Sequence, residues 1–131
     1  MNTGNLRIET VALRVAHLDQ ALAFWIQGCG LEETTRIPTE RFESVILKVP
    51  GLEGSAVQLI EDYQEKSAVV HGDGLRKLVM SCDNVDERMA VAAAHGGTVV
   101  SPPSELPHLK GLLIGSMTCP DGYLVEFLQY Q

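Results

Sequence analysis

Glu126, in the segment Tyr123 to Gln129, is the residue best placed to do chemistry. Alternation along a strand would put its carboxyl group on the same face as Leu124 and Leu128. Burial between leucines disfavours the charged form of a carboxylate, whereas a nearby cation favours it. We therefore expect a cation beside Glu126, forming either a structural ion pair or an acid–base pair.

The other reactive side chains form no recognisable constellation. The serines lack a nucleophile-elbow motif, and the chain has no glycine-rich phosphate loop. The cysteines are odd in number and widely spaced, which argues against a disulfide framework or a structural zinc site; they are Cys29, Cys82 and Cys119. The histidines of the loops have no partner at metal-ligand spacing and are expected to be solvated.

A repeat organises the elements that must position these groups. Residues 10–25 and 77–92 align at a constant offset of 67 residues, which pairs Leu13 with Met80 and Asp19 with Asp86. Each copy passes from alternating apolar residues, typical of a half-buried strand, to apolar residues at helical spacing. Both copies then reach glycines, where helices commonly end. The sequence therefore predicts two strand–helix modules that share one core.

Three further strands complete each module. Strands are expected over residues 8–15, 31–36, 42–49 and 55–60, and again over residues 75–82, 98–100, 109–119 and 123–129. Helices should begin after His17 and Asn84, of which Asn84 is the better N-cap. Residues 101–107 contain three prolines and are expected to form a loop. One domain is expected over residues 1–131, with module 1 at about 6–62, a linker at 63–73 and module 2 at about 74–131.

Composition narrows the class of protein. A chain of 131 residues with 45% hydrophobic residues fits one domain, and no apolar run approaches the roughly 20 residues of a membrane helix. The first ten residues do not resemble a signal peptide, so we expect a cytoplasmic protein without a membrane partner. The formal net charge of -7 disfavours nucleic acid and favours a neutral or cationic small molecule.

Four segments carry a family resemblance: VALRVAHLDQALAFW, GCGLE, VQLIED and CPDGYLVEFLQ. They resemble the vicinal oxygen chelate superfamily, which includes glyoxalase I, bleomycin-resistance proteins, fosfomycin-resistance transferases and extradiol dioxygenases. The resemblance implies an α+β fold in which two tandem βαβββ modules form an open, curled cup. It also implies a homodimer, with a ligand or metal inside the cup.

In glyoxalase-like members of that superfamily, metal ligands occupy four equivalent strand positions. The resemblance places these positions at Thr10, Gln58, Lys77 and Glu126. Thr10 and Gln58 offer only neutral oxygens, and a lysine ammonium has no lone pair to donate to a metal. We therefore expect no metal cofactor. The alternative is a divalent metal, zinc, nickel, iron or manganese, held by an unusual set of ligands.

Lys77 is then the natural cation for Glu126, and two interpretations stay open. The pair either fills the metal position as a structural ion pair, which we favour, or acts as an acid and a base on a ligand. Arg14 also has two interpretations. It resembles an arginine with which glyoxalase I contacts its substrate's carboxylate, but it also fits a strand-end arginine paired with a surface acid.

Together these features predict a metal-free protein that binds a small organic molecule, a drug or a metabolite, and sequesters it. The ligand would meet Thr10, Arg14, Gln58, Lys77 and Glu126. Three alternatives remain: a metal-dependent lyase, isomerase or dioxygenase, a metal-free isomerase that uses Lys77 and Glu126, and a regulatory module with a filled cup.

Overall fold

The computed structural model describes Gly4, residues 6–54 and residues 56–131, and its elements form two similar halves. The first half consists of β1 (Val11–Arg14), α1 (Leu18–Leu22), the π-helix η1 (Ala23–Gly28), β2 (Glu32–Pro38), β3 (Phe42–Lys48) and β4 (Val57–Asp62). The second half consists of β5 (Leu78–Ser81), α2 (Val85–Ala94), β6 (Thr98–Glu105), β7 (Leu112–Thr118) and β8 (Leu124–Tyr130). No helix within the described residues is long and apolar enough to cross a membrane.

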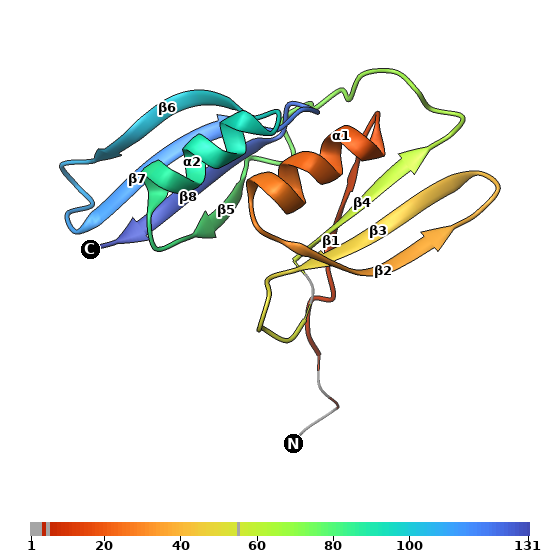
Figure 1. Cartoon of the computed structure of the whole chain (residues 1–131), viewed down its shortest axis with the longest axis horizontal. Helices are drawn as coiled ribbons and strands as arrows, with labels where there is room; N and C mark the ends of the chain where they lie inside the picture. Colours follow the sequence, from red (N-terminus) through yellow and green to blue (C-terminus); the bar gives the residue numbers. More distant parts are fainter. Residues whose placement is uncertain (1–3, 5, 55) are drawn as a thin grey trace.

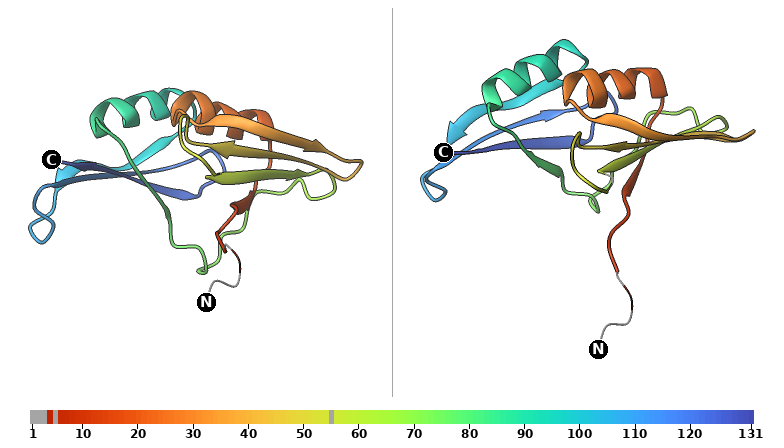
Figure 2. Two further views of the ribbon diagram at one scale, coloured as in Figure 1. Left: turned by 90° about the horizontal axis from the view of Figure 1, so that it is seen from below. Right: turned by 60° about the horizontal axis from the view of Figure 1, so that its bottom comes forward.

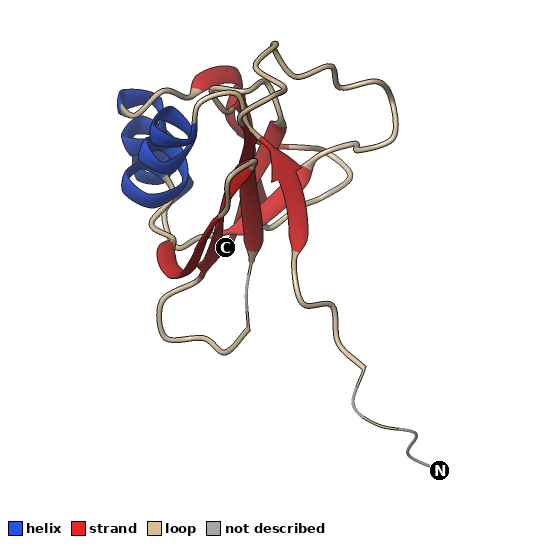
Figure 3. Cartoon of the chain, turned by 90° about the vertical axis from the view of Figure 1, so that its right-hand side faces the viewer, coloured by secondary structure: helices blue, strands red, loops and turns tan. Residues whose placement is uncertain are grey.

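Each half folds into its own four-stranded mixed sheet. The strand orders are β1-β4-β3-β2 and β5-β8-β7-β6, so each sheet has one parallel pair and two antiparallel pairs. The two helices lie side by side near the middle of the molecule (Figure 1). They cover the same side of both sheets and leave the other side without a helix (Figures 2 and 3). The α+β fold of two tandem βαβββ modules is therefore confirmed.

Buried side chains fill the space between the sheets and the helices. Alternation sends Val57 and Leu59 of β4 inwards, and Val125 and Phe127 of β8 do the same in the second half. Gln58 and Glu126 lie between these pairs and therefore belong to the opposite face of each sheet. The sequence pattern thus separates an apolar face beneath the helices from a more polar face that no helix covers.

Each helix begins with the same hydrogen bond, which the sequence did not reveal. The backbone N–H of Leu18 donates to Glu61 Oε1 at 2.7 Å, and that of Val85 donates to Gln129 Oε1 at 2.8 Å. Both acceptors come from the last strand of the same module and satisfy an otherwise unpaired helix N–H. Asn84 also caps α2 as expected, because its side chain accepts from the N–H of Glu87.

The first helix continues from α1 into η1, a π-helix that ends near Cys29. The N–H of Cys29 donates to the carbonyl of Phe24 at 2.8 Å, one residue further back than in an α-helix. Phe24 and Trp25 are both buried, with their rings edge to face at 5.1 Å between centroids. Trp25 is therefore a core residue.

Three hydrogen bonds between described residues join the two halves. Asp121 Oδ1 accepts from the N–H of Ala16 at 2.9 Å, and the Tyr123 hydroxyl donates to the carbonyl of Arg14 at 2.7 Å. On the helix side, Arg88 Nη1 donates to the carbonyl of Gly28 at 2.8 Å. The turn before β8 and the helix α2 are thus fastened to the first module.

Some expected element boundaries are wrong. Residues 101–107 were expected to form a loop, but β6 runs through Pro102 and Pro103 to Glu105. An edge strand tolerates proline, because its outer N–H groups need no partner, and the register with β7 shifts here. The first strand is also shorter than residues 8–15, since it covers only Val11–Arg14 and Ile8 before it is 85% exposed. Ser55, the expected start of the fourth strand, lies outside the described residues.

Candidate functional site

The four family positions occupy equivalent places in the two modules. Gln58 stands opposite Ala12 in the β1–β4 ladder, and Glu126 stands opposite Val79 in the β5–β8 ladder. Ala12 and Val79 are 67 residues apart, which is the offset of the sequence repeat. Thr10 precedes β1 and Lys77 precedes β5, each by one residue. The two halves therefore present corresponding pairs, one neutral and one charged.

The charged pair forms a direct ion pair. Lys77 Nζ lies 2.8 Å from Glu126 Oε2, which is also hydrogen-bonding distance. The Lys77 side chain is 37% exposed and that of Glu126 is 19% exposed. The expected cation beside Glu126 is therefore present, and water can reach the pair, so it is not the deeply buried pair whose loss would be most costly.

The neutral pair is not joined in the same way. Gln58 Nε2 donates to Ser44 Oγ at 2.5 Å, across the neighbouring strand, and Ser44 is buried. The Thr10 hydroxyl has only a long contact of 3.5 Å with the carbonyl of Val11. The Gln58 side chain is thus hydrogen-bonded within its own sheet and not to Thr10. Ser44 is a residue of this site that the sequence reasoning missed, although its place opposite Ile60, two residues from Gln58, was implicit in the alternation of β3.

These side chains do not suit the divalent metal that the fold family implies. The one carboxylate among the four positions is already neutralised by Lys77, and an ammonium would repel a second cation. Gln58 offers a single neutral amide oxygen, and Thr10 offers a hydroxyl. Within the described residues, no group of three or more His, Cys, Asp and Glu side chains has metal-binding geometry. The donor set therefore does not fit the metal.

Arg14 points into the linker rather than towards Glu126. Its guanidinium donates to the carbonyls of Glu65, Ser67 and Ala68 at 3.1, 3.1 and 3.2 Å. Three acceptors take up much of its donor capacity and hold residues 65–68 against β1. The structure thus gives Arg14 a structural task that neither sequence interpretation included, and ligand binding by Arg14 stays a prediction.

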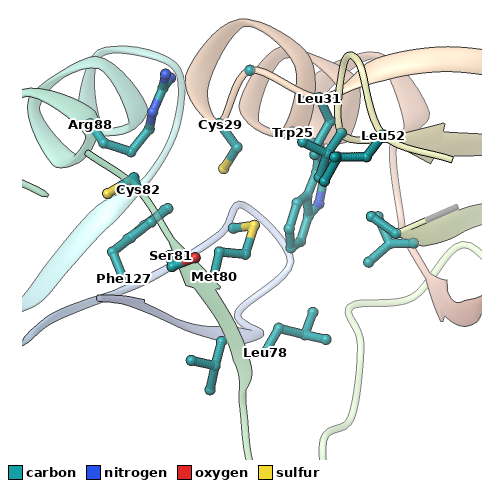
Figure 4. Close-up of a pocket in the computed structure, with 15 residues that line it drawn as sticks. Trp25, Cys29, Leu31, Leu52, Leu78, Met80, Ser81, Cys82, Arg88 and Phe127 are labelled. Carbon is teal, nitrogen blue, oxygen red and sulfur yellow. The ribbon is translucent and has the colours of Figure 1, made fainter. Parts of the chain in front are cut away.

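A cavity of about 450 Å³ lies where the two modules meet. Figure 4 shows Trp25 and Leu31 on one side, Arg88 on the other, and Leu78 and Met80 of β5 between them. None of the five residues expected to bind ligand lines it. Sequence reasoning missed this cavity because its walls come from segments that only the packing of the modules brings together. Arg88, the one basic residue of α2, was the available signal.

The family model of the Glyoxalase/Bleomycin resistance protein/Dioxygenase superfamily matches residues 7–127. The chain therefore belongs to this superfamily, and the resemblance seen in its sequence is confirmed. No curated protein matches the chain.

Solved structures agree on the fold. A glyoxalase family protein from Bacillus cereus superposes with a TM-score of 0.82 at 17% identity, covering 99% of this chain and 98% of that chain. Glyoxalase I from Zea mays gives 0.79 at 18% identity and covers 94% of this chain, which spans only 44% of the maize chain. TioX from Micromonospora sp. ML1 gives 0.69 at 20% identity, covering 93% and 97%. At such low identity these likenesses show the fold alone.

Proposed function

We propose that this chain is a small-molecule-binding member of the superfamily that works without a metal and sequesters a drug or metabolite. The ion pair between Lys77 and Glu126 is the observation that supports the proposal, because it puts a cation at a position where glyoxalase-like members hold a metal ligand. The ligand would bind on the sheet face that the helices leave uncovered, beside this pair and Gln58.

The same geometry supports a second candidate, a metal-free isomerase. Lys77 is 37% exposed, so a ligand can reach the ammonium and the carboxylate together. Because the two groups lie 2.8 Å apart, one bound molecule could be within hydrogen-bonding distance of both, as general acid–base catalysis requires. The two candidate functions use the same site. A sequestering protein would release its bound molecule unchanged, whereas an isomerase would release a converted product.

We also propose a homodimer. Val11 of β1 and Val79 of β5 lie on edge strands and are 41% and 49% exposed. Edge strands with exposed apolar residues are commonly covered by another chain. A second copy that covered these edges would also enclose the open face beside Lys77 and Glu126.

Calorimetric titration with zinc tests the metal-free proposal. The wild type should bind no zinc stoichiometrically, because Lys77 occupies the position. A Thr10→His, Lys77→His variant replaces the ammonium with imidazole ligands and should bind zinc. Tight binding by the wild type would overturn the proposal in favour of a metal-dependent enzyme. Binding by neither protein would mean that these four positions do not converge.

Native mass spectrometry of protein purified from cells tests the ligand itself. A sequestering protein should carry a small molecule that is released unchanged on unfolding. Incubation of the released molecule with fresh protein then separates the two candidates, since an isomerase would convert it and a sequestering protein would return it intact.

A further inference from the structure

The cavity between the modules has apolar walls built from both halves of the chain. Trp25 and Leu31 come from the first module, and Leu78, Met80 and Phe127 come from the second (Figure 4). Its volume of about 450 Å³ falls within the range of small-molecule sites, roughly 300–1,000 Å³. Phe127 lines the cavity but neither Lys77 nor Glu126 does, so the ion pair is not part of the cavity wall.

Arg88 is the cation of this cavity, and it lacks an acidic partner. Its one hydrogen bond with the described residues goes from Nη1 to the carbonyl of Gly28, and no carboxylate there lies within ion-pair distance. Arg36, by contrast, pairs with Glu33 and Glu43 at 2.7 Å each. A half-buried guanidinium with several unused donors is suited to bind a carboxylate.

The two thiols beside Arg88 do not supply the missing negative charge. Burial raises the pKa of Cys29 to about 12, although Arg88 acts against that shift. Burial also raises the pKa of Cys82, again with Arg88 opposing it. Both cysteines are therefore neutral at pH 7, and the positive charge of Arg88 remains uncompensated within the cavity wall.

Trp25 adds an apolar ring to the cavity wall. Its indole N–H is buried and has no hydrogen-bond partner among the described residues. The N–H has almost no accessible surface, so a ligand in the cavity would contact the ring of Trp25 and not this donor. Among the described residues, the wall of the cavity combines a large apolar surface with the guanidinium of Arg88 and the hydroxyl of Ser81, and it contains no carboxylate.

We propose that this cavity is a second binding site, which takes a small monocarboxylate with an apolar body. The body packs against Trp25, Leu78 and Met80, and the carboxylate accepts hydrogen bonds from Arg88. This ligand class differs from the neutral or cationic one that the net charge of -7 favours for the molecule as a whole. The local cation decides the preference because it is adjacent to the ligand, whereas distant surface charges are screened at physiological ionic strength.

Tryptophan fluorescence tests the site directly, because Trp25 is the only tryptophan of the chain. Wild-type protein is titrated with octanoate and with 1-octanol in 0.15 M salt, and the change in emission is followed. Both probes have the same apolar body, but only octanoate can pair with Arg88. Octanoate should change the emission saturably and bind about tenfold more tightly than octanol, as expected for one charge-assisted hydrogen-bonded contact.

Two variants with equal changes of net charge separate the local contact from a general charge effect. Arg88→Gln should bind octanoate and octanol with similar affinity, whereas Arg41→Gln removes an exposed cation paired with Asp62 and should leave the tenfold preference intact. Arg88→Lys should retain part of the preference and shows whether the position tolerates replacement. No saturable emission change with wild-type protein, or an equal loss in both glutamine variants, would overturn the proposal. The zinc titration is independent of this outcome, since it probes Lys77 and Glu126.

Discussion

Replacing Lys77 or Glu126 measures how much their ion pair contributes to stability. At 2.8 Å, Coulomb's law with the dielectric constant of water gives about 1.5 kcal/mol. Because Lys77 is 37% exposed, ordering of its side chain and competition from water reduce this value. We expect a coupling free energy of about 1 kcal/mol. This is below the figure of about 3 kcal/mol that applies when a partner is removed from a fully buried pair.

The assay is a double-mutant cycle. Wild type, Lys77→Met, Glu126→Gln and the double variant are unfolded with urea at one fixed protein concentration, and the free energies of unfolding are compared. Each single variant should be destabilised, and the double variant should be less destabilised than the sum of the two. In 1 M salt the coupling should shrink, because water reaches this pair. Zero coupling at low salt would refute the ion-pair reasoning, and about 3 kcal/mol that salt does not reduce would refute the exposure argument.

Three further outcomes are expected. Gly97→Ala should destabilise the protein by about 2 kcal/mol in thermal unfolding, because the added Cβ would lie 2.8 Å from Phe24 Cε1 and 3.0 Å from the carbonyl oxygen of Ala92. Gly74→Ala is the matched control, since a Cβ added there would have no heavy atom within 4 Å. Burial raises the pKa of Asp121, so this carboxyl group keeps its proton to higher pH in the native state than in the unfolded state. Its contribution to the free energy of unfolding should therefore fall as pH rises from about 3.8 through the raised pKa. Asp121→Asn should remove this decline, measured by urea unfolding at a series of pH values. Sedimentation at micromolar concentration should give twice the chain mass of 14.3 kDa, and a monomer would count against the homodimer.

Local pattern was enough to predict most of the fold. The 67-residue repeat and the change of period in each copy predicted both modules, and α2 begins directly after Asn84, as expected. The predicted secondary structure was wrong where tertiary contacts, and not the local sequence, determine the backbone conformation. Pro102 and Pro103 are typical of a loop, yet both lie within β6, because β6 is an edge strand of its sheet and tolerates proline. The π-helix was also hidden, since its extra residue depends on how Phe24 and Trp25 pack.

The candidate site was predictable only in part. The pairing of Lys77 with Glu126 followed from the family positions, because Lys77 directly precedes β5 and Glu126 lies on the adjacent strand β8. The hydrogen bonds of Arg14 with the linker could not be predicted, since no local sequence signal shows that residues 65–68 lie against β1. The cavity beside Arg88 was even harder to predict from the sequence. Its walls are separated along the chain and meet only when the modules dock.

The hydrogen bonds that start the two helices couple each helix to the completion of its own module. The acceptors Glu61 and Gln129 lie 43 and 44 residues after the N–H groups of Leu18 and Val85. Each N–H must therefore bond to water until the last strand of its module has docked, which ties helix initiation to a long-range event during folding. In hydrogen exchange, the amides of Leu18 and Val85 act as two separate reporters, one for the opening of each half. A difference between their exchange rates would show which half of the duplicated chain opens first.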